Sequence, residues 1–506
     1  MKEHGKGYAR IKSITFTNFR NIECGKVDFA NGDIDSFYDG FSSITGIYGQ
    51  NGSGKTAVLV AINILRGMLL GQKITNRNLV KIGCDYAQLS YELSVFDDSD
   101  SKYNVTYSFD LFDRKPYSEN VVIENDSNDE GASEKKDAVL YDVKNETIEY
   151  DGVAFDGKKL KHKVLFSTKD EYCANGTKSF GTQKNTVKDA GYDAIVKNDY
   201  LRAKLLARRE DASANGCSFL FYGNLDGTDK ATHNNMSVPT MIKLSNRLKE
   251  HDEAVYQWLC VYGAYIVVSM IDEQGLVSLN QLPLTLFDVS QGYINIRKLI
   301  SLNKELQLSG KFAALYEEEF SKINGIVSQL IPGVGIKLKY LGEYVSSTDV
   351  NNVIKRYELV SIRNGVEVPL QSESNGIKRI VSFVTVLIAA YNNPFVTFAI
   401  DEFDSGIFED LLGKIVMIFE ESGKGQLIFT SHNLRPLEVL DWRSIVFTTT
   451  NSKNRFIPLQ KQKSNNLRDQ YLRKIKFGGA AEELYNNPDE YKLKLQLAFS
   501  NSDGGV

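Results

Sequence analysis

The sequence is poor in cysteine, and its five cysteines show no pairing pattern. They are scattered as Cys24, Cys84, Cys173, Cys217 and Cys260. No C-x-x-C spacing occurs, so the pattern excludes the usual zinc site and also a disulfide framework. Unpaired cysteines are typical of a reducing compartment. We therefore expect a cytoplasmic protein.

Long apolar segments are lacking as well. Residues Met1–Tyr8 contain no apolar core of a secretory signal. The most hydrophobic window, residues 380–400, is interrupted by Asn392, Asn393 and Pro394. That break suits a helix, a turn and a buried strand better than a membrane span. We expect no membrane partner.

The charge balance excludes another class of protein. Lys and Arg number 60 against 64 Asp and Glu, which leaves a formal net charge of −4 over 506 residues. The chain is therefore no polycation that coats nucleic acid, although the net charge does not exclude a local basic groove. No heptad pattern persists, so a long coiled-coil arm is unsupported. There are no internal repeats, and the length predicts about two to four domains.

A phosphate-binding loop is the strongest motif present. Its G-x-x-x-x-G-K-T pattern is formed by Gly49, Gln50, Asn51, Gly52, Ser53, Gly54, Lys55 and Thr56. The glycines allow backbone N–H groups to surround a phosphate, Lys55 adds a positive charge, and the Thr56 hydroxyl can bind Mg²⁺. A chance match occurs in about one chain in a hundred of this length. An apolar strand at 41–48 and a helix at 56–65 flank the motif, which favours ATP and Mg²⁺ binding.

An acidic pair completes the predicted catalytic site. Residues 395–400 form a short apolar run, which is typical of a central parallel strand, and Asp401 and Glu402 follow it. Asp401 can hold Mg²⁺ through water, and Glu402 can orient or deprotonate the attacking water. An acidic pair at an ordinary strand end is the alternative. The phosphate loop favours the catalytic interpretation.

Two further segments accompany these motifs. Residues 426–431 form another apolar strand, and His432 follows it. Ser374, Asn375 and Gly376, called here the signature, precede a helix at 380–391 and could present a hydroxyl and N–H groups to an anion. A simple helix N-cap is the alternative for these three residues.

The order of these motifs resembles that of ABC-type ATPases of the OLD, RecF and SMC group. The Glu-Ser-x-Gly-x-x-Arg form of the signature looks most like the prokaryotic "AAA family, ATP/GTP-binding" proteins found in antiphage loci. The resemblance implies that His432 senses the γ-phosphate and that Asp404 belongs to a D-loop. It also implies that Arg20 and Asn21, in an Asn-Phe-Arg-Asn segment, lie beside the nucleotide. The Q-loop glutamine is not assigned, because Gln88 has no distinctive context.

The resemblance implies an α/β fold in which an ATPase head, a mixed sheet with flanking helices, carries a helical insertion. Alternating strands at 10–30 and 87–112 belong to its N-terminal lobe, and the polar segment 124–137 predicts a mobile loop in a β-rich extension. Helical spacing at 241–270 and 296–330 predicts the insertion. We divide the chain into residues 1–112, 113–189, 190–334 and 335–506, the last being the C-terminal lobe and tail.

The resemblance further implies an ATPase that works as a head-to-head homodimer or a higher oligomer. Each phosphate loop would face the partner's signature, and hydrolysis would open the dimer. The chain lacks Asp-x-Asp and H-N-H nuclease patterns after His432. We therefore expect a sensor of antiphage defence that controls a separate effector protein, docked on residues 190–334. The alternative is a DNA-repair or chromosome-type clamp, so DNA is a second candidate partner. A transporter subunit fits poorly, because those chains are shorter.

Overall fold

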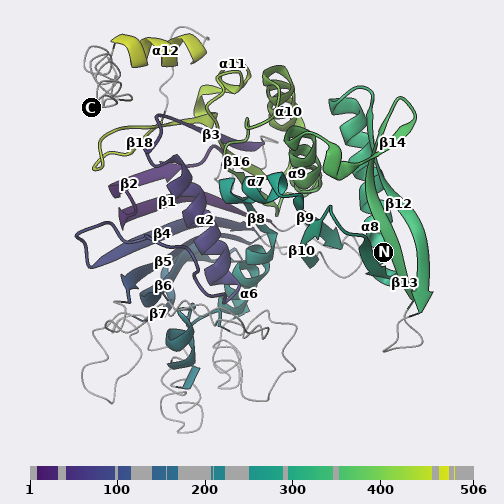
Figure 1. Cartoon of the computed structure of the whole chain (residues 1–506). Coiled ribbons are helices and arrows are strands. Elements are labelled where there is room, and N and C mark those ends of the chain that lie inside the picture. The colour runs from purple at the N-terminus through teal and green to yellow at the C-terminus, as the bar shows by residue number, and fades with distance from the viewer. Residues whose placement is uncertain are drawn as a thin grey trace, which may run out of the picture.

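The computed structural model describes residues 8–31, 42–96, 101–114, 140–154, 157–168, 207–208, 210–222, 250–288, 294–345, 353–458, 467–477 and 484. Two six-stranded sheets with flanking helices form a head, and a smaller sheet lies beside it (Figure 1). This mixed α/β architecture confirms the predicted fold class. The predicted loop at 124–137 lies outside the described residues.

The first sheet carries the predicted catalytic motifs. Its strands run in the order β18-β17-β3-β16-β15-β8, and every neighbouring pair is parallel except β17 and β18. The strands are short and mostly apolar, and β3, β15, β16 and β17 are buried along their whole length, because both faces of such a sheet are covered. Their bounds are Ser43–Tyr48 (β3), Ile266–Ser269 (β8), Thr397–Ile400 (β15), Gln426–Thr430 (β16), Ile445–Thr448 (β17) and Phe456–Pro458 (β18). Since β3, β16 and β15 are parallel neighbours, the loops after them open at one edge.

The second sheet is antiparallel and has the order β2-β1-β4-β5-β6-β7. Alternate side chains of its strands are buried, as the sequence predicted. The bounds are Tyr8–Phe19 (β1), Ile22–Asp28 (β2), Tyr86–Phe96 (β4), Lys102–Asp113 (β5), Tyr141–Val153 (β6) and Lys159–Ser167 (β7). Buried Gln426 joins this sheet to the first, because its amide accepts from Ile11 N at 3.1 Å and donates to Ile11 O at 2.8 Å.

Four helices flank the sheets. They are α2 (Lys55–Leu69), α6 (Glu250–Tyr265), α9 (Asn375–Asn392) and α10 (Glu409–Ser422). The Tyr91 hydroxyl of the second sheet donates to Ala61 O of α2 at 2.8 Å. Helix α6 contacts the first sheet through Tyr262 and Thr397, whose hydroxyls lie 2.6 Å apart. The helices therefore fix the two sheets relative to each other.

A third sheet, called here the side sheet, lies at the right of Figure 1. It contains β11 (Leu306–Ser309), β12 (Val334–Val345), β13 (Val353–Arg363) and β14 (Val366–Pro369), with α8 (Gly310–Leu330) packed on it. Asn364 and Gly365 have φ of 49° and 80°, as a type I′ turn requires, and they join β13 to β14 in a hairpin. Arg363 then pairs twice with Glu373, at 2.7 and 2.6 Å, and so ties the hairpin to the residue before the signature.

The region predicted as a helical insertion also contains strands. Residues 296–309, predicted as helix, instead contribute to β10 (Ile294–Ser301) and β11, and helix α8 begins only at Gly310. Residues 266–269, also predicted as helix, form β8 at the edge of the first sheet. Short apolar runs fit both periodicities, and the β-branched Ile266, Val267 and Val268 pack well in a buried strand. The α6–β8 unit is therefore part of the head.

The remaining elements connect these layers. They are α7 (Ile271–Ser278), β9 (Gln281–Asp288), the 3₁₀ turns η3 (Leu370–Ser372) and η4 (Trp442–Ser444), α11 (Pro436–Val439) and α12 (Leu467–Phe477). Within the described part of the chain, no helix is both long and apolar enough to cross a membrane.

Candidate nucleotide-binding site

The phosphate loop connects β3 to α2 as predicted. Gly54 is the N-cap of α2 and has a φ of 99°, which only glycine adopts without strain. Gly49 has no room for a side chain, because a Cβ there would lie 1.9 Å from Thr448 Oγ1. The first N–H groups of α2 have no partner within the helix and carry its positive dipole end. The loop is therefore shaped to receive an anion.

Lys55 lies inside the loop. Its ammonium donates to Gly49 O at 2.8 Å and to Gln50 O at 3.0 Å. Burial lowers the pKa of Lys55, while Asp401 and Glu402 oppose that shift. The amine is thus held at the loop by weak acceptors, from which it can turn to a phosphate oxygen.

One cavity of about 1390 Å³ joins most of the predicted residues. The predicted residues that line it are Arg20, Asn21, Asn51, Gly52, Gly54, Lys55, Thr56, Asp401, Glu402 and His432. Gly49, Gln50 and Ser53 lie behind this wall, where the Ser53 hydroxyl donates to Gln50 O at 2.6 Å. The cavity is large enough for a nucleoside triphosphate.

The acidic pair follows β15 as predicted, and β16 supports it. Thr430 donates through its hydroxyl to Asp401 and accepts from the Glu402 N–H at 2.8 Å. Glu402 has a φ of 44°, a rare conformation for a non-glycine residue that neighbouring contacts must hold in place. Arg379 of α9 supplies them: its guanidinium donates to Ser405 O at 2.7 Å, to Asp401 O at 3.0 Å and to Glu402 O. The turn of residues 401–405, called here the catalytic turn after the prediction for Glu402, is thus fixed from two sides.

Asp404 does not line the cavity, but it forms hydrogen bonds to the loop that carries His432. Its carboxylate accepts from the backbone N–H of His432 at 3.2 Å and from that of Asn433 at 3.1 Å. The predicted D-loop and the predicted sensor histidine are therefore linked within one chain.

The signature lies outside the cavity of its own chain. Ser374 caps α9, since its hydroxyl accepts from Ile377 N at 3.4 Å, and Asn375 donates to Ser278 Oγ at 3.0 Å. A Cβ on Gly376 would lie 2.3 Å from Gly406 O, so the D-loop and α9 touch through two glycines. The helix-cap interpretation of Ser374 therefore holds within one chain.

Several cavity residues were missed by sequence reasoning. Arg77, Lys81, Arg114 and Tyr141 line the wall beyond Arg20. They come from the loop after α2 and from β-strand ends, where no motif marks them. Gln88, considered for the Q-loop, instead donates to Asp110 at 2.9 Å and does not line the cavity.

The donor set fits a nucleotide with Mg²⁺. No cluster of three or more His, Cys, Asp or Glu within the described ranges could hold a metal by itself. Mg²⁺ is commonly bound by one or two protein oxygens together with substrate phosphates. Thr56 and Asp401 would supply those protein oxygens here.

A family model matches residues 44–438, which include every part of this site except the Arg20 segment. Its description is "AAA domain, putative AbiEii toxin, Type IV TA system". The chain belongs to this AAA family. The matched residues contain the phosphate loop, the acidic pair and His432, so these parts of the site lie within the AAA domain. None of the curated proteins compared with it matches.

Solved structures similar to the AAA protein include SMC heads and a RecF protein. An "SmcHead bound to the C-winged helix domain of ScpA" is 13% identical with a TM-score of 0.40 and covers 90% of this chain and 98% of its own. The "SMC head domain from Thermotoga maritima" is 14% identical with a TM-score of 0.34, covering 89% and 100%. The "recombination mediator protein RecF-ATPrS in RecFOR pathway" is 13% identical with a TM-score of 0.33, covering 90% and 99%. At such TM-scores we draw no functional conclusion.

Proposed function

We propose that this protein hydrolyses ATP to ADP and phosphate. The observation that carries the proposal is the cavity in which Lys55, Thr56, Asp401, Glu402 and His432 meet. These residues come from the ends of β3, β15 and β16, which the parallel sheet places side by side.

Each residue has a defined part in the proposed reaction. Lys55 and the N–H groups that begin α2 bind the β- and γ-phosphates. Mg²⁺, held by Thr56 and Asp401, neutralises phosphate charge when it is bound. Glu402 accepts the proton of the attacking water, and His432 contacts the γ-phosphate from the loop that Asp404 holds.

Two substitutions separate binding from turnover. Lys55→Ala should lose nucleotide affinity, because a principal phosphate charge is removed. Glu402→Gln should bind ATP normally but stop hydrolysis, because no proton acceptor remains. Glu409→Gln removes an exposed carboxylate at the start of α10 and serves as the matched control. Equal loss of ATP affinity in the Lys55 and Glu402 variants would contradict these assignments.

We further infer a head-to-head homodimer, at least with ATP bound. Ser374 and Asn375 are exposed at the start of α9 and do not reach their own cavity. They can meet a nucleotide in a second copy. Mixing Lys55→Ala protein with Ser374→Arg protein should then restore one intact composite site and partial ATPase activity. A mixture as inactive as both parents would refute the sandwich.

The proposed biological role is that of a sensor in an antiphage defence module. The family description refers to a toxin and a toxin–antitoxin system, which supports a partner effector, docked on residues 190–334. A hundredfold preference of the effector for one nucleotide state requires about 2.7 kcal/mol. The amount of effector recovered in a pull-down should therefore differ between Glu402→Gln protein trapped with ATP and wild type bound to ADP. Equal recovery with ATP, with ADP and without nucleotide would exclude the switch.

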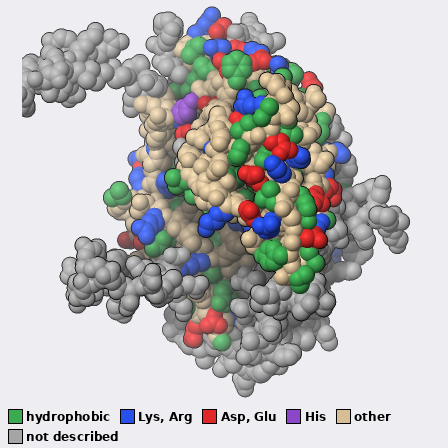
Figure 2. Space-filling view, turned by 45° about the vertical axis from the view of Figure 1, so that its right-hand side comes forward, with side chains coloured by type: hydrophobic (Ala, Val, Ile, Leu, Met, Phe, Trp, Pro, Cys, Tyr) green, Lys and Arg blue, Asp and Glu red, His purple; other side chains and the backbone are tan. Residues whose placement is uncertain are grey.

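A DNA clamp is the alternative role. On the face seen in Figure 2, basic and acidic side chains are interspersed rather than gathered into a continuous basic surface. A clamp must show DNA affinity that falls steeply with salt, because bound phosphates release counterions. DNA binding measured at low and at high salt therefore separates the two roles.

A further inference from the structure

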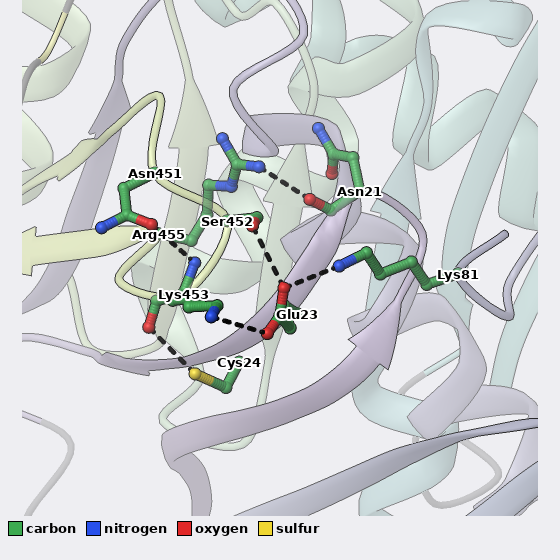
Figure 3. Close-up of polar contacts among 8 residues, drawn as sticks. All are labelled: Asn21, Glu23, Cys24, Lys81, Asn451, Ser452, Lys453 and Arg455. Atoms are coloured by element: carbon green, nitrogen blue, oxygen red, sulfur yellow. Dashed lines mark hydrogen bonds and ion pairs between the residues drawn. The ribbon is translucent and has the colours of Figure 1, made fainter. Parts of the chain in front are cut away.

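Arg455 is a buried arginine beside the phosphate loop. It lies in the turn between β17 and β18 and is only 6% exposed. Its guanidinium donates to Thr449 O at 2.7 Å. It also donates to Asn21 O at 2.7 Å (Figure 3). The first bond lies within the turn, and the second joins the turn to the segment that links β1 and β2.

No carboxylate neutralises Arg455 among the residues that the structure describes. Burial alone lowers its pKa. Glu23, the acidic residue drawn in Figure 3, instead pairs with Lys81 at 2.9 Å and with Lys453 at 3.7 Å. The Arg455 Nε atom also lacks a hydrogen-bond partner in the described part of the chain. Burying an uncompensated cation is unfavourable, so a compensating anion is expected nearby.

The phosphate loop is the immediate neighbour of this cation. Arg455 Cγ and Cδ lie 3.4 Å from the position that a Cβ on Gly54 would take. The Asn21 amide, whose backbone carbonyl accepts from Arg455, donates to Gly52 O of the same loop. Thr448, at the start of the turn, contacts the Ser53 hydroxyl. The turn therefore packs against the phosphate loop, although Arg455 itself does not line the cavity.

We propose that Arg455 is a positioning residue for the nucleotide, whose buried positive charge is compensated by the bound phosphates and whose planar fork fixes Asn21 against the phosphate loop. The proposal rests on ATP binding at the cavity. The positive charge of Arg455 acts on the nucleotide across the phosphate loop. It therefore lowers the binding free energy of ATP more than that of ADP, because ATP carries more phosphate charge. The fork requires a planar group with two donors, which lysine cannot replace.

The test compares Arg455→Met and Arg455→Lys in the full chain, with dissociation constants for ATP and ADP and kcat for ATP. Arg455→Met should weaken ATP binding about tenfold and ADP binding less, because ATP carries one more phosphate charge. Arg455→Lys keeps the charge and should bind ATP within about threefold of wild type, with a lower kcat because the fork is lost. Arg443→Met, which removes an exposed arginine paired with Asp441, is the control and should leave both constants unchanged.

The outcomes separate the proposal from its premise. Wild type that fails to bind ATP would refute the proposed function itself. Wild type that binds ATP, with unchanged affinity in Arg455→Met or with equal losses for ATP and ADP, would overturn the charge role. If Arg455→Met does not fold, Arg455→Lys decides: a tenfold loss of ATP affinity overturns the charge role, and an unchanged kcat overturns the positioning role.

Discussion

Replacing Gly376 by alanine tests the contact between the signature and the D-loop. The added Cβ would lie 2.3 Å from the Gly406 carbonyl oxygen, far inside contact distance. That oxygen belongs to backbone, and Gly406 itself has a φ of 73°, so the D-loop cannot yield cheaply. Relief requires α9 and the D-loop to separate.

The expected cost follows from overpacking, which typically destabilises by about 1–3 kcal/mol. Gly325→Ala is the matched control, because Gly325 lies within α8 and a Cβ there would contact nothing within 4 Å. Alanine should stabilise that helix by up to about 1 kcal/mol. The two substitutions are chemically identical, so helix propensity alone predicts the same sign for both.

Thermal unfolding of the nucleotide-free protein is the assay. We expect the transition of Gly376→Ala to fall by about 2–6 °C and that of Gly325→Ala to rise slightly. Because the contact lies within one chain, the shift should not depend on protein concentration. A Gly376→Ala protein as stable as Gly325→Ala would refute the close approach of α9 to the D-loop.

Three further predictions concern polar contacts that position the loops of the site and the signature. Asp404→Ala should keep ATP affinity but lower kcat about tenfold, since the loop that carries His432 loses the acceptor of two N–H groups; nucleotide titration and a phosphate-release assay check this. Arg379→Met should lower kcat further than ATP affinity, because three carbonyls of the catalytic turn lose their donor, and unchanged kcat would contradict this support. The Arg363 guanidinium, through its hydrogen bonds, lowers the pKa of Glu373, so this pair stabilises the protein above the unfolded-state pKa and less as pH falls below it. Arg363→Met should therefore lower the free energy of unfolding at pH 7 and flatten the loss of stability as pH falls below the ordinary glutamate pKa of about 4.3, as urea unfolding at a series of pH values would show.

The sequence was sufficient for the parts of the site that are local. The phosphate loop and its flanking strand and helix are contiguous in the sequence. Asp401 and Glu402 directly follow a clear run of apolar residues. The parallel arrangement of such strands then predicts that their ends meet. The Asn364–Gly365 hairpin was equally predictable, because its turn chemistry is confined to two residues.

The supports of the site could not be predicted, because they join distant residues. Asp404 holds an N–H group 28 positions away, and Arg455 holds a carbonyl 434 positions away. The spacing of such residues in the sequence does not predict that they are in contact. The strands β8 and β10 were missed for a different reason, since a short apolar run satisfies helical and strand periodicity alike.

The position of β17 and the turn after it has a consequence for protein synthesis. The phosphate loop contacts Thr448 through Ser53, and the two residues are 395 positions apart. At about 5–20 residues per second, a ribosome needs roughly 20–80 s to pass from one to the other. Throughout that interval the nascent chain displays its phosphate loop without the strand and the turn that support it. Nucleotide capture should therefore be a late, nearly post-translational event, and a ribosome stalled before residue 448 should hold a chain that does not retain ATP.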